Sequence, residues 1–457
     1  MKVLFLLLLI GSLSALKSHA QTAENYVQQG NTWLKEKKYK EALGQYNAAI
    51  ALDSTYIPAY INKGRALYDQ GAYTQAQEAF GKVILLKPNQ ASAYFNRAQA
   101  YAAATYYESA ILDYTSALDL HAEYTEALYE RAKVYQALSR NLAAIDDLTK
   151  ILEWRAANPD QELYQDAYTL RGVSYRMHGQ LDMALADLNK AIQWQPEDAI
   201  AYYHRGVIKA NQGAIDAGLL DLTKAIQLQP NFVNAYYQRG LLYHSGRSYK
   251  NALKDFTKVL QIEPTANKAY IARGYTYASM GKAKDALKDY DKALVKNDKD
   301  AATYIRRGYA NLQLNNHEAA LNDFTIVINI NDLYAGYGYN NRGNVKRLMK
   351  DYEGALQDIH KAMEIDSLNA FAYSNRAQVA ADQGSKEDAL ADWARAIELN
   401  NQVAEFYYYR GRFYLQEKQY DKAVSDLSKS LEIAPYYETK AVKAALKTAK
   451  KKFLTEQ

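Results

Sequence analysis

Charged residues that could bind an anion or form ion pairs recur through the sequence at one fixed spacing. Arg239 precedes Asp255 by 16 residues, and Arg273 precedes Asp289 by the same distance. A free row of guanidinium groups could bind carboxylates or phosphates, whereas a matched row of aspartates would neutralise it. The spacing therefore predicts structural ion pairs. Ten such pairs occur: Arg97 with Asp113, Arg131 with Asp147, Arg171 with Asp187, Arg205 with Asp221, Arg239 with Asp255, Arg273 with Asp289, Arg307 with Asp323, Arg342 with Asp358, Arg376 with Asp392 and Arg410 with Asp426.

No pattern of reactive residues in the sequence indicates catalysis. The sequence contains no cysteine, and its seven histidines form neither an H-E-x-x-H pair nor a zinc-ligand spacing. The glycine-rich stretch GYGYNNRG, which begins at Gly336, lacks the preceding strand that a dinucleotide-binding fingerprint needs. We therefore predict no catalytic, cofactor-binding or metal-binding residue, and we expect that the chain is not an enzyme.

A repeat of about 34 residues positions the arginines and aspartates. Each repeat has a small residue at position 8, such as Gly240, and a second at position 20, such as Ala252. An insertion at 154–165 is expected to be a surface loop, with a hinge or a binding loop as the alternatives. The predicted boundaries of the twelve repeats are 23–56, 57–90, 91–124, 125–164 with the insertion, 165–198, 199–232, 233–266, 267–300, 301–335, 336–369, 370–403 and 404–437.

The pattern inside one repeat predicts two antiparallel helices that are joined near position 15. Positions 4, 8 and 11 share one face of the first helix, and positions 20, 24 and 27 share one face of the second. One hairpin cannot bury its apolar faces alone, so neighbouring hairpins are expected to stack. The paired arginine is at position 7 and its aspartate at position 23, which lie at the same height on the two helices. Both series are absent from the first two repeats, so we predict pairing within each hairpin.

The repeat resembles the tetratricopeptide repeat family. The repeat 233–266 carries the family's signature at Tyr236, Gly240, Tyr243, Ala252, Phe256, Val259 and Pro264. The resemblance implies an all-α, right-handed solenoid of about twelve helix-turn-helix repeats, with a concave groove lined mainly by the first helices. The basic segment 438–457 is expected to form a C-terminal capping helix.

Aromatic and amide side chains are predicted to line the concave groove. Seen along the first helix, positions 5, 6 and 9 lie on the side opposite the ion-pair residues. These side chains could pack between neighbouring first helices, bind an extended peptide, or stack on a glycan. The predicted groove residues are Phe95, Tyr129, Tyr203, Tyr237, Tyr275, Tyr309, Asn340, Asn341 and Asn344.

The two ends of the sequence carry separate signals. Residues 1–20 combine Lys2, a short apolar run and small residues before a cleavage site after Ala20, which predicts a secretory signal peptide. The net charge of +5 comes largely from the C-terminal tail, so a nucleic-acid partner is not expected. Membrane association would require the basic tail or an uncleaved signal. We expect an exported protein, periplasmic or extracellular, in a bacterial cell envelope.

These features together predict a non-enzymatic scaffold that binds a partner protein or an extended peptide in its groove. The alternative is an envelope module that binds glycan or assists a secretion machine.

Overall fold

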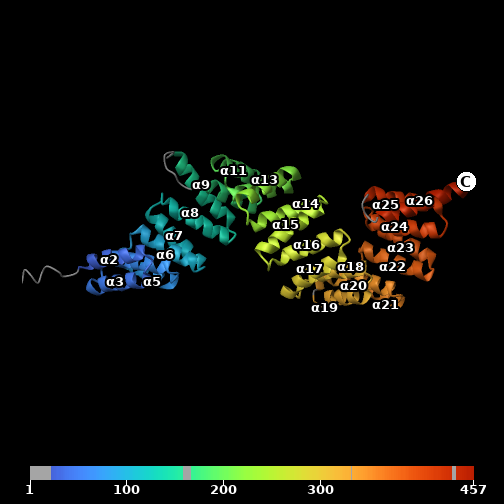
Figure 1. Ribbon diagram of the computed structural model, residues 1–457, viewed down its shortest axis with the longest axis horizontal. Coiled ribbons are helices and arrows are strands. Elements are labelled where there is room, and N and C mark those ends of the chain that lie inside the picture. The colour runs from blue at the N-terminus through green and yellow to red at the C-terminus, as the bar shows by residue number, and fades with distance from the viewer. Residues whose placement is uncertain (1–21, 158–165, 331, 435–438, 457) are drawn as a thin grey trace, which may run out of the picture. The chain divides into compact units, whose positions relative to one another are not determined.

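The computed structural model describes residues 22–157, 166–330, 332–434 and 439–456, and within these ranges it contains 25 helices and no strands (Figure 1). The predicted signal peptide and residues 158–165 of the insertion lie outside the described residues. The chain divides into two compact halves, residues 1–232 and 233–457.

The helices of the first half are α2 (Ala23–Lys35), α3 (Tyr39–Leu52), α4 (Ile57–Asp69), α5 (Tyr73–Leu86), α6 (Ala91–Ala103), α7 (Tyr107–Leu120), α8 (Thr125–Ala137), α9 (Asn141–Ala157), α10 (Ala167–Met177), α11 (Leu181–Trp194), α12 (Ala199–Asn211) and α13 (Ile215–Leu228). Those of the second half are α14 (Val233–Ser245), α15 (Tyr249–Ile262), α16 (Asn267–Ser279), α17 (Ala283–Lys296), α18 (Ala301–Gln313), α19 (His317–Ile330), α20 (Asp332–Leu348), α21 (Tyr352–Ile365), α22 (Ala370–Gln383), α23 (Lys386–Leu399), α24 (Ala404–Gln416), α25 (Tyr420–Ile433) and α26 (Thr439–Glu456). Within each half, consecutive helices pack against one another, and the fold is an α-solenoid of stacked helical hairpins.

A left-handed backbone residue separates the two helices of each hairpin. Five of these residues are glycines, for which a positive φ carries no steric penalty. The other seven carry side chains, and Thr105 at φ 64° is the least favourable of them because its Cβ is branched. The turn is therefore imposed by the packing of the two helices as much as by the turn residue itself.

Small residues let the two helices of a hairpin cross closely. The first helix of each hairpin has glycine or alanine where the large apolar side chain of the second helix packs; Gly274, for example, faces the fully buried Tyr290. The crossing between α12 and α13 has glycine on both sides. A Cβ added to Gly218 would lie 2.8 Å from the carbonyl oxygen of Gly206. This hairpin therefore depends on backbone-to-backbone contact.

Replacing Gly218 with alanine is expected to destabilise the chain, although the other eleven repeats have alanine at that position. The new methyl would collide with rigid backbone, and overpacking of this kind lowers stability by roughly 1–3 kcal/mol. Gly44, in the middle of α3, has open space around its Cα, so Gly44→Ala should instead raise stability by about 0.5–1 kcal/mol. Urea unfolding of both variants measures the two effects. A stabilised Gly218→Ala variant would contradict the close crossing.

Helix α20 differs from the predicted repeat boundary. It begins at Asp332, four residues before the expected start of that repeat, and only residue 331 separates it from α19. Gly338 makes this early start possible, since a Cβ there would lie 2.7 Å from Cγ1 of Ile328. The glycine-rich stretch that begins at Gly336 is thus a helix-packing feature.

The final helix, α26, covers the end of the last hairpin. It packs on α25 and α24, with Val442 and Ala449 fully buried. Its lysines lie on the exposed side: Lys440, Lys443, Lys447, Lys450, Lys451 and Lys452. Among the described residues, no helix combines the length and the apolar character that crossing a membrane requires.

Candidate functional site

The ten arginines and ten aspartates form a row of buried ion pairs. In Arg273, Nε lies 2.8 Å from Oδ2 of Asp289 and Nη2 lies 2.8 Å from Oδ1. Arg239 binds Asp255 with the same two distances. Each of the other eight arginines also donates Nε and Nη2 to the aspartate of its own hairpin. Such two-point contacts fix the register of the two helices.

The remaining guanidinium nitrogen links successive hairpins. Nη1 of Arg273 donates to the hydroxyl of Thr257 on the preceding second helix, at 3.1 Å. The same contact joins Arg131 to Thr115, Arg171 to Thr149, Arg205 to Asn189, Arg307 to Asp291 and Arg342 to Thr325. Sequence reasoning missed this link, although a polar residue two positions after the preceding aspartate signals it. One arginine thus holds both its own hairpin and the repeat stack together.

Tyrosine rings surround these arginines, and the aspartates stabilise the positive charge of each guanidinium group. The guanidinium carbon of Arg239 lies 5.6 Å from the ring centre of Tyr236 and 5.8 Å from that of Tyr243, within cation–π range. The hydrogen bond from Arg273 to Asp289 raises the pKa of Arg273, and burial opposes this shift. Each arginine of the row is consequently neutralised by the aspartate of its own hairpin. An external anion would have to displace buried carboxylates to reach it.

A groove in the second half collects three of the predicted site residues. It has a volume of about 600 Å³ and is lined by side chains of α16, α17, α18, α20 and α24. Tyr275 and Tyr309 lie in it with exposed fractions of 50% and 48%, and Asn344 lies beside them. Arg306 and Tyr409 also line it. The groove therefore combines half-exposed aromatic rings with polar and cationic groups.

Family models identify the repeat. Models described as TPR repeat match residues 64–104 and 172–213, and models described as tetratricopeptide repeat match 233–265, 271–325 and 374–438. Together the matches cover about half of the chain. The chain is a tetratricopeptide repeat protein.

Solved structures that the chain matches include the following three. The APC/C hetero-tetramer Cut9-Hcn1 structure is 16% identical, with 97% of this chain and 98% of that chain covered and a TM-score of 0.45. Yeast Tom70 is 20% identical, with coverages of 95% and 96% and a TM-score of 0.41. A tetratricopeptide repeat protein from Parabacteroides merdae is 18% identical, with coverages of 62% and 98% and a TM-score of 0.43. No curated protein matches the chain.

The three predicted asparagines of this tetratricopeptide repeat protein have different environments. Asn340 and Asn341 are buried, with their side-chain oxygens accepting hydrogen bonds from Asn375 at 2.9 Å and from Tyr309 at 2.8 Å. Asn344 accepts from Arg347 and is the one of the three that lines the groove. Asn341 therefore positions the groove residue Tyr309, whereas Asn344 is itself part of the groove lining.

The other predicted groove residues lie outside this hollow. Tyr237 packs on Phe256 and lines a separate hollow of about 320 Å³. In the first half, Phe95 lines a hollow of about 380 Å³ together with Arg65 and Tyr68. Tyr129 donates its hydroxyl hydrogen to Asp166, and Tyr203 packs on Phe232 and His204. The aromatic residues thus form several local surfaces.

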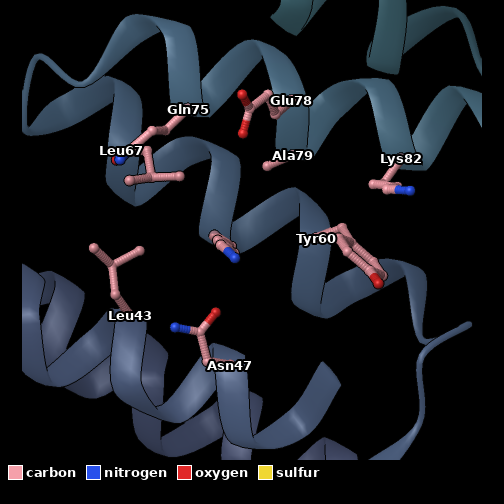
Figure 2. Close-up of a pocket in the computed structure, with 9 residues that line it drawn as sticks. Leu43, Asn47, Tyr60, Leu67, Gln75, Glu78, Ala79 and Lys82 are labelled. Atoms are coloured by element: carbon pink, nitrogen blue, oxygen red, sulfur yellow. The ribbon is translucent and has the colours of Figure 1, made fainter. Parts of the chain in front are cut away.

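A further hollow of about 400 Å³ lies among α3, α4 and α5, where Asn47 and Ala79 face it from different helices (Figure 2). This hollow coincides with the repeats that lack the ion pair. Lys63 occupies the position of the paired arginine, Ala79 that of the aspartate, and Asn47 that of the Nη1 partner. In the ten repeats that carry the ion pair, the arginine and aspartate side chains fill the equivalent space. The missing pair therefore accounts for this hollow, and we assign no ligand to it. No group of three or more potential metal ligands occurs in the described part of the chain.

Proposed function

We propose that this tetratricopeptide repeat protein is a non-enzymatic scaffold that binds an extended segment of a partner protein in the groove of its second half. The family is typical of protein–protein interaction scaffolds. The observation that carries the proposal is the groove of about 600 Å³ in which Tyr275, Tyr309 and Asn344 come together from three different repeats. Aromatic rings with polar tips are well suited to peptide binding because they offer apolar contact area and a hydrogen-bonding group.

The two tyrosines are held in place before any partner binds. The ring of Tyr275 lies 4.7 Å from the ring of His244, centre to centre. The hydroxyl of Tyr309 donates to Asn341 at 2.8 Å. A side chain that is already ordered loses less conformational entropy on binding, which favours affinity. The exposed halves of both rings thus form a rigid surface for apolar side chains of a peptide.

Replacing Tyr275 and Tyr309 with alanine is expected to weaken partner binding by about tenfold or more, because truncated aromatic anchors lose roughly 2 kcal/mol at interfaces. Proteins captured from a cell-envelope extract by the full chain and by the double variant are compared quantitatively. Tyr106→Ala is the matched control, since Tyr106 is 57% exposed and lies outside the groove. Equal capture by all three proteins would refute binding at this groove.

Peptides and oligosaccharides are then used as competitors for the captured partner. Competition by peptides supports the scaffold. Competition by oligosaccharides alone would favour the glycan-binding alternative, in which sugars stack on the same rings.

We also propose that the chain is exported to the cell envelope. Support comes from the basic residue, apolar run and small residues of 1–20. N-terminal sequencing of the protein isolated from its native cell is expected to begin at Gln21, and an intact Met1 would count against cleavage.

A further inference from the structure

Two second helices of the second half, α15 and α17, carry lysines at the same three positions of their repeats. Both helices pack on α16 (Figure 1). The three lysines of each helix follow one another at intervals of four residues, so they lie along one side of it. We call these six residues the lysine face: Lys250, Lys254 and Lys258 on α15, and Lys284, Lys288 and Lys292 on α17.

The lysine face lies on the outer surface of these repeats. In α17 the buried residues Ala286, Tyr290 and Ala293 are on the side of the helix opposite Lys288, which is exposed. Tyr290 is also the residue through which α17 lines the groove described above. A ligand bound to the lysine face would therefore leave the groove open.

The fold of the repeat does not account for these lysines. Lys250 and Lys284 lie in the first turn of their helices, where seven of the other ten second helices carry Asp or Glu. An acidic residue is stabilising there, whereas a lysine is disfavoured, because the N-terminus of a helix is positive. At the position of Lys254 and Lys288, none of the other second helices has a cationic residue.

The lysines of each helix also repel one another. In α9, Lys150, at the position equivalent to Lys258, binds Asp146 one turn earlier, at 2.7 Å. In α15 and α17 the residue one turn earlier is another lysine, and like charges four residues apart destabilise a helix. Lysines that oppose both the helix dipole and their own neighbours indicate a role other than folding.

Few carboxylates neutralise the lysine face. In the described part of the chain, the one ion pair that its six lysines form joins Lys288 to Asp285 at 3.3 Å, and these side chains are 74% and 47% exposed. The other aspartates of the two helices each accept hydrogen bonds from an arginine: Asp255, Asp289 and Asp291. The lysine face is therefore an open surface of positive charge.

The chemistry of this surface suits the headgroups of an anionic lipid bilayer. Lysine is a point charge on a flexible stem, whereas recognition of a single carboxylate or phosphate favours the planar fork of arginine. Several lysines presented together attract the spread negative charge of a lipid surface. Val295, which follows Lys288 by two turns on the same side of α17, is 89% exposed and adds an apolar group that a bilayer interface can accept.

Nucleic acid matches the lysine face less well. Binding of single strands relies on aromatic rings on which bases stack. Of the aromatic residues on the two helices, Phe256 and Tyr290 are fully buried, and Tyr249 is partly buried, with its ring centre 5.3 Å from that of His244.

We propose that the lysine face docks the protein on the surface of a lipid bilayer that contains anionic lipids. This docking surface is separate from the groove and goes beyond the proposed scaffold function. Each lysine close to an anionic bilayer contributes about fivefold to the affinity, and salt weakens the attraction.

Binding of the full chain to vesicles, measured by co-sedimentation, tests the proposal. The vesicles contain phosphatidylcholine alone or phosphatidylcholine mixed with phosphatidylglycerol. Replacing all six residues of the lysine face with glutamine should weaken binding to the mixed vesicles by about a hundredfold or more. Binding of the natural chain should also fall as salt is added. The phosphatidylcholine vesicles measure any binding through the apolar run within residues 1–20, which is the same in every variant.

The lysines of α26 provide a control with the same change in net charge. The tail variant replaces six of them with glutamine: Lys440, Lys443, Lys447, Lys450, Lys451 and Lys452. It should retain most of the binding to the mixed vesicles. Equal losses in the two variants would show that net charge alone decides, and a larger loss in the tail variant would assign the binding to α26; either result overturns the proposal.

Folding and the nature of the ligand are checked separately. The lysine-face variant should unfold at the same urea concentration as the natural chain or at a higher one, because the substitutions remove repulsion between like charges. Partner capture through Tyr275 and Tyr309 should be unchanged in this variant, so the proposed function and the docking surface can fail independently. If the natural chain binds a poly-glutamate peptide but not the mixed vesicles, the ligand is an acidic protein and the proposal is wrong.

Discussion

Arg273→Leu is expected to lower the free energy of unfolding by about 3–5 kcal/mol. The substitution removes both hydrogen bonds from the guanidinium group to Asp289 and leaves that carboxylate in a site where its side chain is only 4% exposed. It also removes the hydrogen bond from Nη1 to Thr257, and with it one link between successive repeats. The midpoint of urea unfolding, followed by circular dichroism, measures the loss.

Substitution of the aspartate in the same pair should lower the free energy of unfolding by less. In Asp289→Leu the guanidinium of Arg273 keeps Thr257 and retains some contact with water, because its side chain is 16% exposed. The double variant Arg273→Leu, Asp289→Leu should recover most of the stability lost in Arg273→Leu, since a buried pair can often be replaced by apolar residues without a large penalty. A double variant as unstable as Arg273→Leu would show that the arginine acts in some other way.

An exposed pair of similar geometry provides the control. Arg140 binds Glu108 through two hydrogen bonds, of 3.0 and 2.6 Å, but the two side chains are 47% and 66% exposed. Arg140→Leu should change stability by less than about 1 kcal/mol, because water and salt screen such pairs. The contrast between Arg273 and Arg140 isolates burial as the cause.

The repeated spacing explains why much of the fold could be predicted. Small residues at Gly240 and Ala252 indicated where two helices cross, and the 16-residue separation of Arg239 and Asp255 indicated a contact across one hairpin. Neither of these two predictions depended on how the side chains pack in detail. The link from Arg273 to Thr257 could not be derived in the same way, because it depends on how far one hairpin is rotated against the next.

The groove was harder to predict than the ion pairs for a physical reason. Helical geometry assigned Tyr203 and Tyr309 to the same side of their helices. The side chains against which the two rings pack, however, differ from one repeat to the next. Tyr203 meets Phe232, whereas Tyr309 meets Phe324 and hydrogen-bonds to Asn341. Arg306, which also lines the groove, was overlooked because the prediction named only aromatic and amide side chains there, although the repeat spacing already assigned the neighbouring Arg307 to Asp323.

Acidification is expected to destabilise the first half through His204. Burial is the main cause that lowers the pKa of this histidine to about 3, and the nearby charge of Arg176 adds to it. Nδ1 of His204 is buried without a hydrogen-bond partner in the described structure. In the unfolded chain the imidazole has a pKa of about 6.5. Between these two values the unfolded state binds more protons, so stability falls as the pH falls from about 6.5 towards about 3.

His204→Leu removes this titration and should therefore change the pH dependence of stability. Relative to the variant, the natural chain is expected to lose about 2 kcal/mol between pH 7 and pH 5, since each pH unit below about 6.5 shifts the balance by about 1.4 kcal/mol. The difference should be constant above pH 7. Parallel unfolding curves for the natural chain and His204→Leu between pH 7 and pH 5 would mean that the folded protein accepts the charge on His204, and that its burial does not exclude water.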